Sequence, residues 1–199
     1  MKILVKKIDK YFFFGLLKFL YKQFNSLFFN LNFRKYKESQ IVNYNFSYTL
    51  LGDLADKYGT DKGFNNLNNR IFYNNWHPHN YTDFYSKIFD HNRQHIKNVL
   101  ECGIGSNNPN VPSNMGADYK PGGSLKMWKE YFFNAEIYGA DIDKDILFTE
   151  DRIKTFYVDQ LSADSIKKMW EKIDKKNFDL IIDDGLHNFE AGTIFFNNS

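Results

Sequence analysis

The spacing of hydrophobic positions changes twice along the chain. From Phe13 to Leu31, large apolar side chains recur every three or four residues with lysines towards the opposite side, which predicts an amphipathic helix. The next region is polar and rich in asparagine, and from Asn98 onward short apolar runs alternate with segments of helical period. The pattern predicts three regions: a basic aromatic arm over 1–45, a helical and loop cap over 46–96, and an α/β domain over 97–199.

Four apolar runs predict the strands of the α/β domain. They are NVLEC (98–102), AEIYGADI (135–142), KTFYVD (154–159) and FDLIIDD (178–184). Helices are predicted between them at 124–132 and 162–173, the second capped by Ser162 or Asp164. This alternation predicts a Rossmann-like parallel sheet with flanking helices, in the strand order third, second, first, fourth.

Composition is that of a folded protein, but the charge is divided unevenly. Hydrophobic residues make up 43% and charged residues 25% of the 199 residues. Residues 1–40 contain nine Lys and Arg against two acids, so the remaining residues have 17 bases against 22 acids, a net charge of −5. A basic arm on an acidic body suggests that the arm meets an anionic surface while the body handles small molecules.

The arm has two interpretations. Its helix can lie in a membrane interface with lysines at lipid phosphates, so that residues 1–40 make peripheral membrane contact. Alternatively it packs on the rest of the protein or on a second subunit, and Phe19 and Phe29 do interrupt its polar side. With a single cysteine, Cys102, expected in the core, we predict a cytoplasmic protein, with its inner-membrane contact left open.

Acidic residues follow each predicted strand. The first strand runs into Glu101-x-Gly103-x-Gly105, whose glycines allow a sharp turn and close approach to a ligand. The later strands end in Asp141, which suits ribose hydroxyls, in Asp159, which suits an adenine amino group, and in Asp183, Asp184, Gly185 and His187. Because ligands bind at the carboxyl ends of parallel strands, this pattern predicts a nucleotide-like ligand.

Dinucleotide binding is the rival interpretation. Its fingerprint requires a third glycine three residues after the second, but position 108 is Asn. It also places its ribose-binding acid about 20 residues on, whereas Asp141 lies 38 residues after Gly103. The dinucleotide interpretation is therefore disfavoured.

Three histidines precede the first strand. His77, His79 and His91 suggest a metal cluster, but no Cys or carboxylate spacing supports zinc. The string HNYTDFY in the same region suggests instead a border of the substrate side.

Several long strings resemble one enzyme family. KYGTDK, VLECGIG, YKPGGSLKMWKEYF, IYGADID, RIKTFYVDQ and FDLIIDDGLH, within residues 50–199, resemble metal-dependent sugar O-methyltransferases of the macrocin and mycinamicin type and related capsule and lipopolysaccharide methyltransferases. The resemblance implies S-adenosylmethionine and Mg²⁺ as cofactors and a sugar hydroxyl of a glycan or natural product as acceptor. It implies Glu101, Gly103 and Gly105 beside the methionine part, Asp141 at the ribose, Asp159 at the adenine, Asp184 as magnesium ligand and His187 as general base. For Asp183 two interpretations stay open, contact with the cofactor and capping of the following helix.

These residue types suit methyl transfer. In-line displacement at a sulfonium needs alignment of oxygen, methyl and sulfur, and a sugar hydroxyl needs a base to take its proton. A magnesium ion would orient neighbouring hydroxyls and ease that proton loss.

The chain departs from the family at its end. The family has further strands after the fourth, so we expect those strands to be missing here and the 199-residue chain to be self-associating and inactive by itself. The alternative function is a truncated non-catalytic fragment or cofactor-binding module. We expect a small-molecule or glycan substrate and no nucleic acid, and leave homo-oligomerisation open.

Overall fold

The computed structural model describes residues 48–64, 79–175 and 177–199, all within one compact unit, Ser47–Ser199. The helices are α2 Leu50–Tyr58, α3 Tyr81–Phe89, α4 Gly123–Tyr131, the short 3-10 helix η2 Lys144–Ile146, α5 Ala163–Lys172 and α6 Phe189–Asn198. The strands are β1 Asn98–Cys102, β2 Glu136–Asp141, β3 Thr149–Glu150, β4 Ile153–Tyr157 and β5 Leu180–Asp183.

The basic arm and its predicted membrane contact through residues 1–40 lie outside the described residues. Among the residues that are described, no helix is long and apolar enough to cross a membrane. The division of the chain at residues 45 and 96 stays a prediction.

The sheet confirms the predicted strand order. Its strands run β3-β4-β2-β1-β5, and β4, β2, β1 and β5 are parallel. The two-residue strand β3, which the sequence did not predict, pairs antiparallel with β4. In the register between β1 and β2, Glu101 lies beside Gly139.

Burial along the strands follows their place in the sheet. The strand β1, paired on both sides, is buried over its last four residues, as expected when helices cover both faces. The strand β5 lies at the edge of the described sheet, where Ile182 is buried and Ile181 is 42% exposed.

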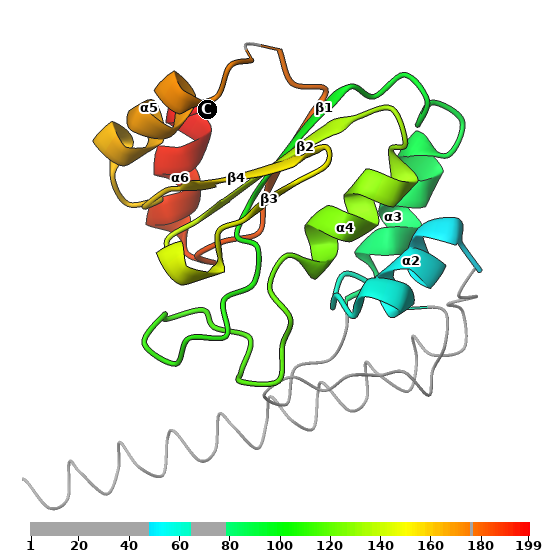
Figure 1. Cartoon of the computed structure of the whole chain (residues 1–199), viewed down its shortest axis with the longest axis horizontal. Coiled ribbons are helices and arrows are strands. Elements are labelled where there is room, and N and C mark those ends of the chain that lie inside the picture. Colours follow the sequence, from blue (N-terminus) through cyan, green and yellow to red (C-terminus); the bar gives the residue numbers. More distant parts are fainter. Residues whose placement is uncertain (1–47, 65–78, 176) are drawn as a thin grey trace, which may run out of the picture. The chain divides into compact units, whose positions relative to one another are not determined.

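Helices cover the sheet in two groups (Figure 1). The helices α2, α3 and α4 lie on one side, where Leu51, Trp128 and Phe132 belong to one buried cluster. The helices α5 and α6 lie on the other side, where Ile166 and Phe195 belong to a second cluster around Leu100 and Cys102. The burial of Cys102 confirms its predicted place in the core.

Local hydrogen bonds explain where the helices begin. The Ser162 side chain accepts from the Ser165 N–H and caps α5, and Asn188 caps α6 in the same way through the Ala191 N–H.

The four parallel strands present their carboxyl ends at one edge of the sheet, where the loops after β1, β2, β4 and β5 meet.

Candidate active site

The turn after β1 is built from glycines that no other residue can replace without strain. Gly103 has φ 87° and Gly105 has φ 81°, both in the left-handed region. A Cβ on Gly103 would lie 2.2 Å from the Asp184 carbonyl oxygen, and one on Gly105 would lie 2.2 Å from the Tyr119 ring. The turn thus packs directly on the backbone that follows β5.

Asp141 joins this turn to the end of β2. Its two carboxylate oxygens each accept one backbone N–H, from Ile104 and from Asp143, both at 2.9 Å. Burial raises the pKa of Asp141, and these two N–H bonds oppose that rise. Because a carboxylate has about four lone-pair sites, Asp141 can still accept hydrogen bonds from a ligand.

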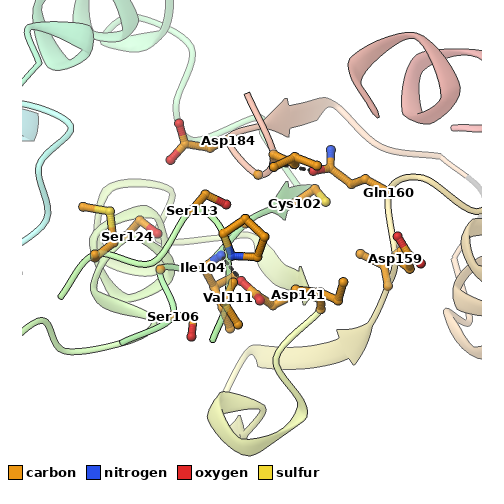
Figure 2. Close-up of a pocket in the computed structure, with 18 of the residues that line it drawn as sticks. Cys102, Ile104, Ser106, Val111, Ser113, Ser124, Asp141, Asp159, Gln160 and Asp184 are labelled. Atoms are coloured by element: carbon orange, nitrogen blue, oxygen red, sulfur yellow. Dashed lines mark hydrogen bonds between the residues drawn. The ribbon is translucent and has the colours of Figure 1, made fainter. Parts of the chain in front are cut away.

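A cavity opens at this edge of the sheet, and we call it the first cavity. Its lining residues come from the loops after all four parallel strands: they include Gly103, Ile104, Gly105, Val111, Pro112, Asp141, Asp159, Gln160, Asp184 and Leu186. Figure 2 shows Asp141 and Asp159 on one side of the view and Asp184 on the other. The lining combines apolar side chains with the carboxylates of Asp141, Asp159 and Asp184, which suits a ligand that has both apolar and polar groups.

A buried lysine, Lys62, is among the lining residues of the first cavity. Lys62, in the loop after α2, is 3% exposed, and its Nζ forms ion pairs with Asp184 and, at 2.9 Å, with Oε1 of Glu101. Glu101 is fully buried, and its other oxygen accepts from the Ser124 hydroxyl at 2.6 Å. The loop after α2 is thereby tied to the ends of β1 and β5.

These contacts fix the charge states. Burial raises the pKa of the Asp184 carboxyl, but the Lys62 ammonium and the contact with His187 outweigh it, so that this pKa lies below its ordinary value. Burial likewise lowers the pKa of Lys62, but the two carboxylates raise it well above its ordinary value. Asp184 is therefore ionised and Lys62 protonated at neutral pH.

A second cavity lies on the other side of this pair. It is lined by Lys62, Tyr81, Tyr85, Ile182, Asp183, Asp184 and His187. The Nε2 of His187 lies 3.8 Å from Oδ1 of Asp184, and the interaction between these side chains raises the pKa of His187. Lys62 and Asp184 line both cavities, and we call this shared part of the two linings the partition.

The predicted site residues divide between these cavities. Gly103, Gly105, Asp141, Asp159 and Asp184 line the first cavity, and Asp183, Asp184 and His187 line the second. Glu101 is not among the lining residues of either cavity and contacts the site through Lys62 and Ser124.

Of the two interpretations of Asp183, the structure contradicts capping, and contact with the cofactor stays a prediction. Asp183 does not line the first cavity, and the cap of α6 is Asn188, so the capping interpretation is wrong. Instead Asp183 accepts from Gln160 Nε2 at 2.7 Å, while Oε1 of Gln160 accepts from the Leu186 N–H at 2.6 Å. These two bonds connect the loops after β4 and β5.

Sequence reasoning missed two residues of the site, Lys62 and Gln160. Lys62 and Gln160 were present in the strings KYGTDK and RIKTFYVDQ, but nothing in those strings indicated their partners. The string HNYTDFY was the better signal, because Tyr81 and Tyr85 within it line the second cavity.

The described residues contain no group of three or more His, Cys, Asp or Glu side chains that could hold a metal ion. Of the three histidines weighed for zinc, His77 lies outside the described residues, and His79 lies 3.9 Å from Asp61 and stacks on Tyr81. A metal at Asp184 would thus have at most two such ligands from this part of the chain.

Comparison with known proteins agrees with this architecture. No protein-family profile matches the chain. It is 31% identical over 137 residues to the 8-demethyl-8-alpha-L-rhamnosyl tetracenomycin-C 2'-O-methyltransferase of Streptomyces olivaceus, covering 69% of this chain and 30% of that protein. It is 34% identical over 143 residues to the mycinamicin VI 2''-O-methyltransferase of Micromonospora griseorubida, covering 69% of this chain and 29% of that protein.

Solved structures give the same result. The methyltransferase MycE of the mycinamycin pathway, in complex with Mg and SAH, matches with a TM-score of 0.56 at 29% identity, over 76% of this chain and 34% of that one. The chain spans about 30% of the length of the curated relatives it matches. It therefore resembles sugar O-methyltransferases of the macrocin and mycinamicin type and has their Rossmann-like methyltransferase fold.

Proposed function

We propose that this chain contains the cofactor site and part of the acceptor site of an S-adenosylmethionine-dependent sugar O-methyltransferase. One observation carries the proposal: two cavities meet at a partition formed by Lys62 and Asp184. The glycine turn and strand-end carboxylates line one of them, and a histidine beside a carboxylate lines the other. The likeness to the tetracenomycin and mycinamicin methyltransferases supports a sugar hydroxyl as the acceptor.

The first cavity suits S-adenosylmethionine. Gly103 and Gly105 line this cavity, and because they lack a Cβ their turn can pack directly on the Asp184 backbone and the Tyr119 ring. The methionine part would lie against the backbone of this turn. Asp141 would accept the ribose hydroxyls and Asp159 the adenine amino group, while Glu101 would act indirectly, by holding Lys62 and Ser124. When bound, the cofactor supplies an electrophilic methyl group.

Asp184 suits a magnesium ion as a single-carboxylate ligand. It lines both cavities, stays ionised and already attracts a cation, the Lys62 ammonium. Mg²⁺ is commonly held by one or two carboxylates with water and substrate oxygens completing its octahedron. Such an ion would orient neighbouring hydroxyls of the acceptor and make their protons easier to lose.

The second cavity would receive the acceptor. Tyr81 and Tyr85 add aromatic side chains to a lining that also contains carboxylates and a histidine, a mixture that suits the apolar and polar sides of a sugar. The His187 imidazole would take the proton of the reacting hydroxyl, and Asp184 would orient that imidazole. Methyl transfer then requires the hydroxyl oxygen to lie about 3–3.5 Å from the methyl carbon and in line with the sulfur, where the two cavities adjoin.

Isothermal titration of S-adenosylhomocysteine tests the cofactor site. Charged hydrogen bonds contribute about 1.5–3 kcal/mol each, so Asp141→Ala is expected to weaken binding roughly 10- to 100-fold. The matched control is Asp164→Ala, because Asp164 lies on the surface in an ion pair with Lys168 and is not among the lining residues of either cavity. Unchanged affinity in Asp141→Ala, or binding of NADH in place of S-adenosylhomocysteine, contradicts the proposal.

A further inference from the structure

Lys62 is almost fully buried, although nothing in the sequence around it predicts a buried lysine. Lysine is almost never fully buried unless it is paired, and its pairing here bridges the ends of two neighbouring strands, β1 and β5. Its loop is held in place, since the Lys62 carbonyl accepts from the Thr82 N–H at 3.2 Å. A Cβ on Gly63 would lie 1.9 Å from the Thr82 hydroxyl oxygen, so the loop packs tightly on α3.

The two partners of Lys62 differ in access. Glu101 is fully buried, and its Oε1 accepts no other hydrogen bond in the part of the chain that the structure describes. The Asp184 side chain is 26% exposed and lines both cavities. Lys62 therefore has one permanent counter-ion, Glu101, and one partner that other cations can reach, Asp184.

We propose that Lys62 is a competing counter-ion that divalent cations must displace from Asp184. This inference rests on the proposed function, because it takes Asp184 as the magnesium ligand. Glu101, Lys62 and Asp184 bring together two carboxyl groups and one ammonium, so the cluster has one more acidic than basic group. A divalent ion at Asp184 would lie beside that ammonium, and their repulsion is relieved when Lys62 moves fully onto Glu101.

The pairing of Lys62 differs between the metal-free and the metal-bound site. Without a divalent ion, Lys62 keeps the buried Glu101 and the partly exposed Asp184 from repelling each other and holds Asp184 in place at the partition. With the ion bound, Glu101 takes over the lysine charge, so no buried charge is left unpaired. The cost of this exchange lowers the affinity of Asp184 for divalent cations.

Manganese provides a direct probe of the exchange. Paramagnetic Mn²⁺ at Asp184 would broaden the Cε1–H resonance of His187, which lies beside that carboxylate and can be assigned with His187→Gln. In Lys62→Met, the competing charge is gone and the Mn²⁺ concentration for half-broadening is expected to fall about 10-fold or more. Asp184→Asn should abolish the effect.

The matched control is Lys129→Met. Lys129 also lies between two carboxylates, 3.5 Å from Glu150 and 3.6 Å from Asp151, but it is not among the lining residues of either cavity. Its variant should behave as the parent. If Lys62→Met does not fold because Glu101 is left unpaired, Lys62→Met/Glu101→Gln removes both buried charges, and the same tightening is expected.

The outcomes separate this inference from the proposed function. Unchanged or weaker Mn²⁺ binding in the folded Lys62 variant overturns the competition, as does a lack of His187 broadening in the parent and every variant. Titration of S-adenosylhomocysteine into the parent without metal tests the cofactor site alone. If S-adenosylhomocysteine does not bind, the proposed function is contradicted, while the Mn²⁺ titration still tests the competition at Asp184.

Discussion

The two cavities share Lys62 and Asp184 but differ in whether backbone or side chains give them their shape. The first is shaped by backbone, namely the glycine turn after β1 and the strand-end loops that Asp141 and Gln160 hold together. The second is shaped by side chains, with Tyr81 and Tyr85 from α3 facing the end of β5. A backbone-built site tolerates few residue types, whereas a side-chain-built site can change its ligand without changing the fold. We infer that the first cavity fixes the chemistry and the second selects the acceptor.

The strongest test of this contrast is a single Cβ in the glycine turn. Gly103→Ala combines a positive φ with a clash against the Asp184 backbone. We expect a loss of about 1–3 kcal/mol in the free energy of unfolding from strain, and loss of S-adenosylhomocysteine binding. Urea unfolding and calorimetric titration measure the two effects.

Gly192→Ala is the control for that change. Gly192 lies in α6, and the nearest atom to its Cβ would be an Asp183 carboxylate oxygen at an ordinary 3.6 Å. It should leave binding unchanged and stabilise the fold by up to about 1 kcal/mol. Equal behaviour of the two variants would mean that the first cavity does not depend on its backbone.

An intermediate effect is expected at the aromatic wall. Tyr81→Ala should weaken binding of methyl α-L-rhamnopyranoside about 5- to 10-fold, because roughly 50 Å² of apolar contact at ~25 cal/mol per Å² is lost. Saturation-transfer NMR in the presence of S-adenosylhomocysteine measures this loss, and the affinity for S-adenosylhomocysteine itself should not change.

Phe84→Ala is the matched control on the same helix. Phe84 is 61% exposed and is not among the lining residues of either cavity. The rhamnoside should therefore bind this variant as it binds the parent. A weaker S-adenosylhomocysteine affinity in Tyr81→Ala would show that the two cavities are not separable as proposed.

The smallest effect concerns His187. Its contact with Asp184 raises its pKa above the ordinary value of about 6.5. The stabilisation from this pair is therefore fully present below the unfolded-state pKa and is lost as the pH rises through the folded-state pKa. Asp184→Asn should lower the pKa of His187 in an NMR titration and flatten the stability profile between about pH 6 and 8.

The same NMR titration tests His187 as the proposed general base. A base must be unprotonated to take a proton, so methyl transfer by His187 would rise with pH through its raised pKa. A His187 that titrates at the same pH with and without the Asp184 carboxylate would show that the pair does not interact.

Local pattern predicted the framework of the fold. Runs of apolar residues identified all four parallel strands. The Ser162 cap was predictable because its side chain bonds to the backbone N–H of Ser165, only three residues further along the chain. The glycine turn and the acids after the strands also followed, because parallel strands bring their carboxyl ends to one edge. The short strand β3 was missed, since two exposed residues have no periodicity to detect.

The partition between the cavities was decided only by tertiary structure. Lys62 and Asp184 are 122 positions apart, and Asp183 meets Gln160 across 23. Such pairs depend on which loops the packed sheet brings together, and no hydrophobic period records them. The sequence by itself determined the strands, their order and the residues at their ends. The packing of α2 against α3 and α4 decided that a buried lysine, rather than solvent, would lie between those ends. The Lys62 ammonium there compensates for the burial of its carboxylate partners.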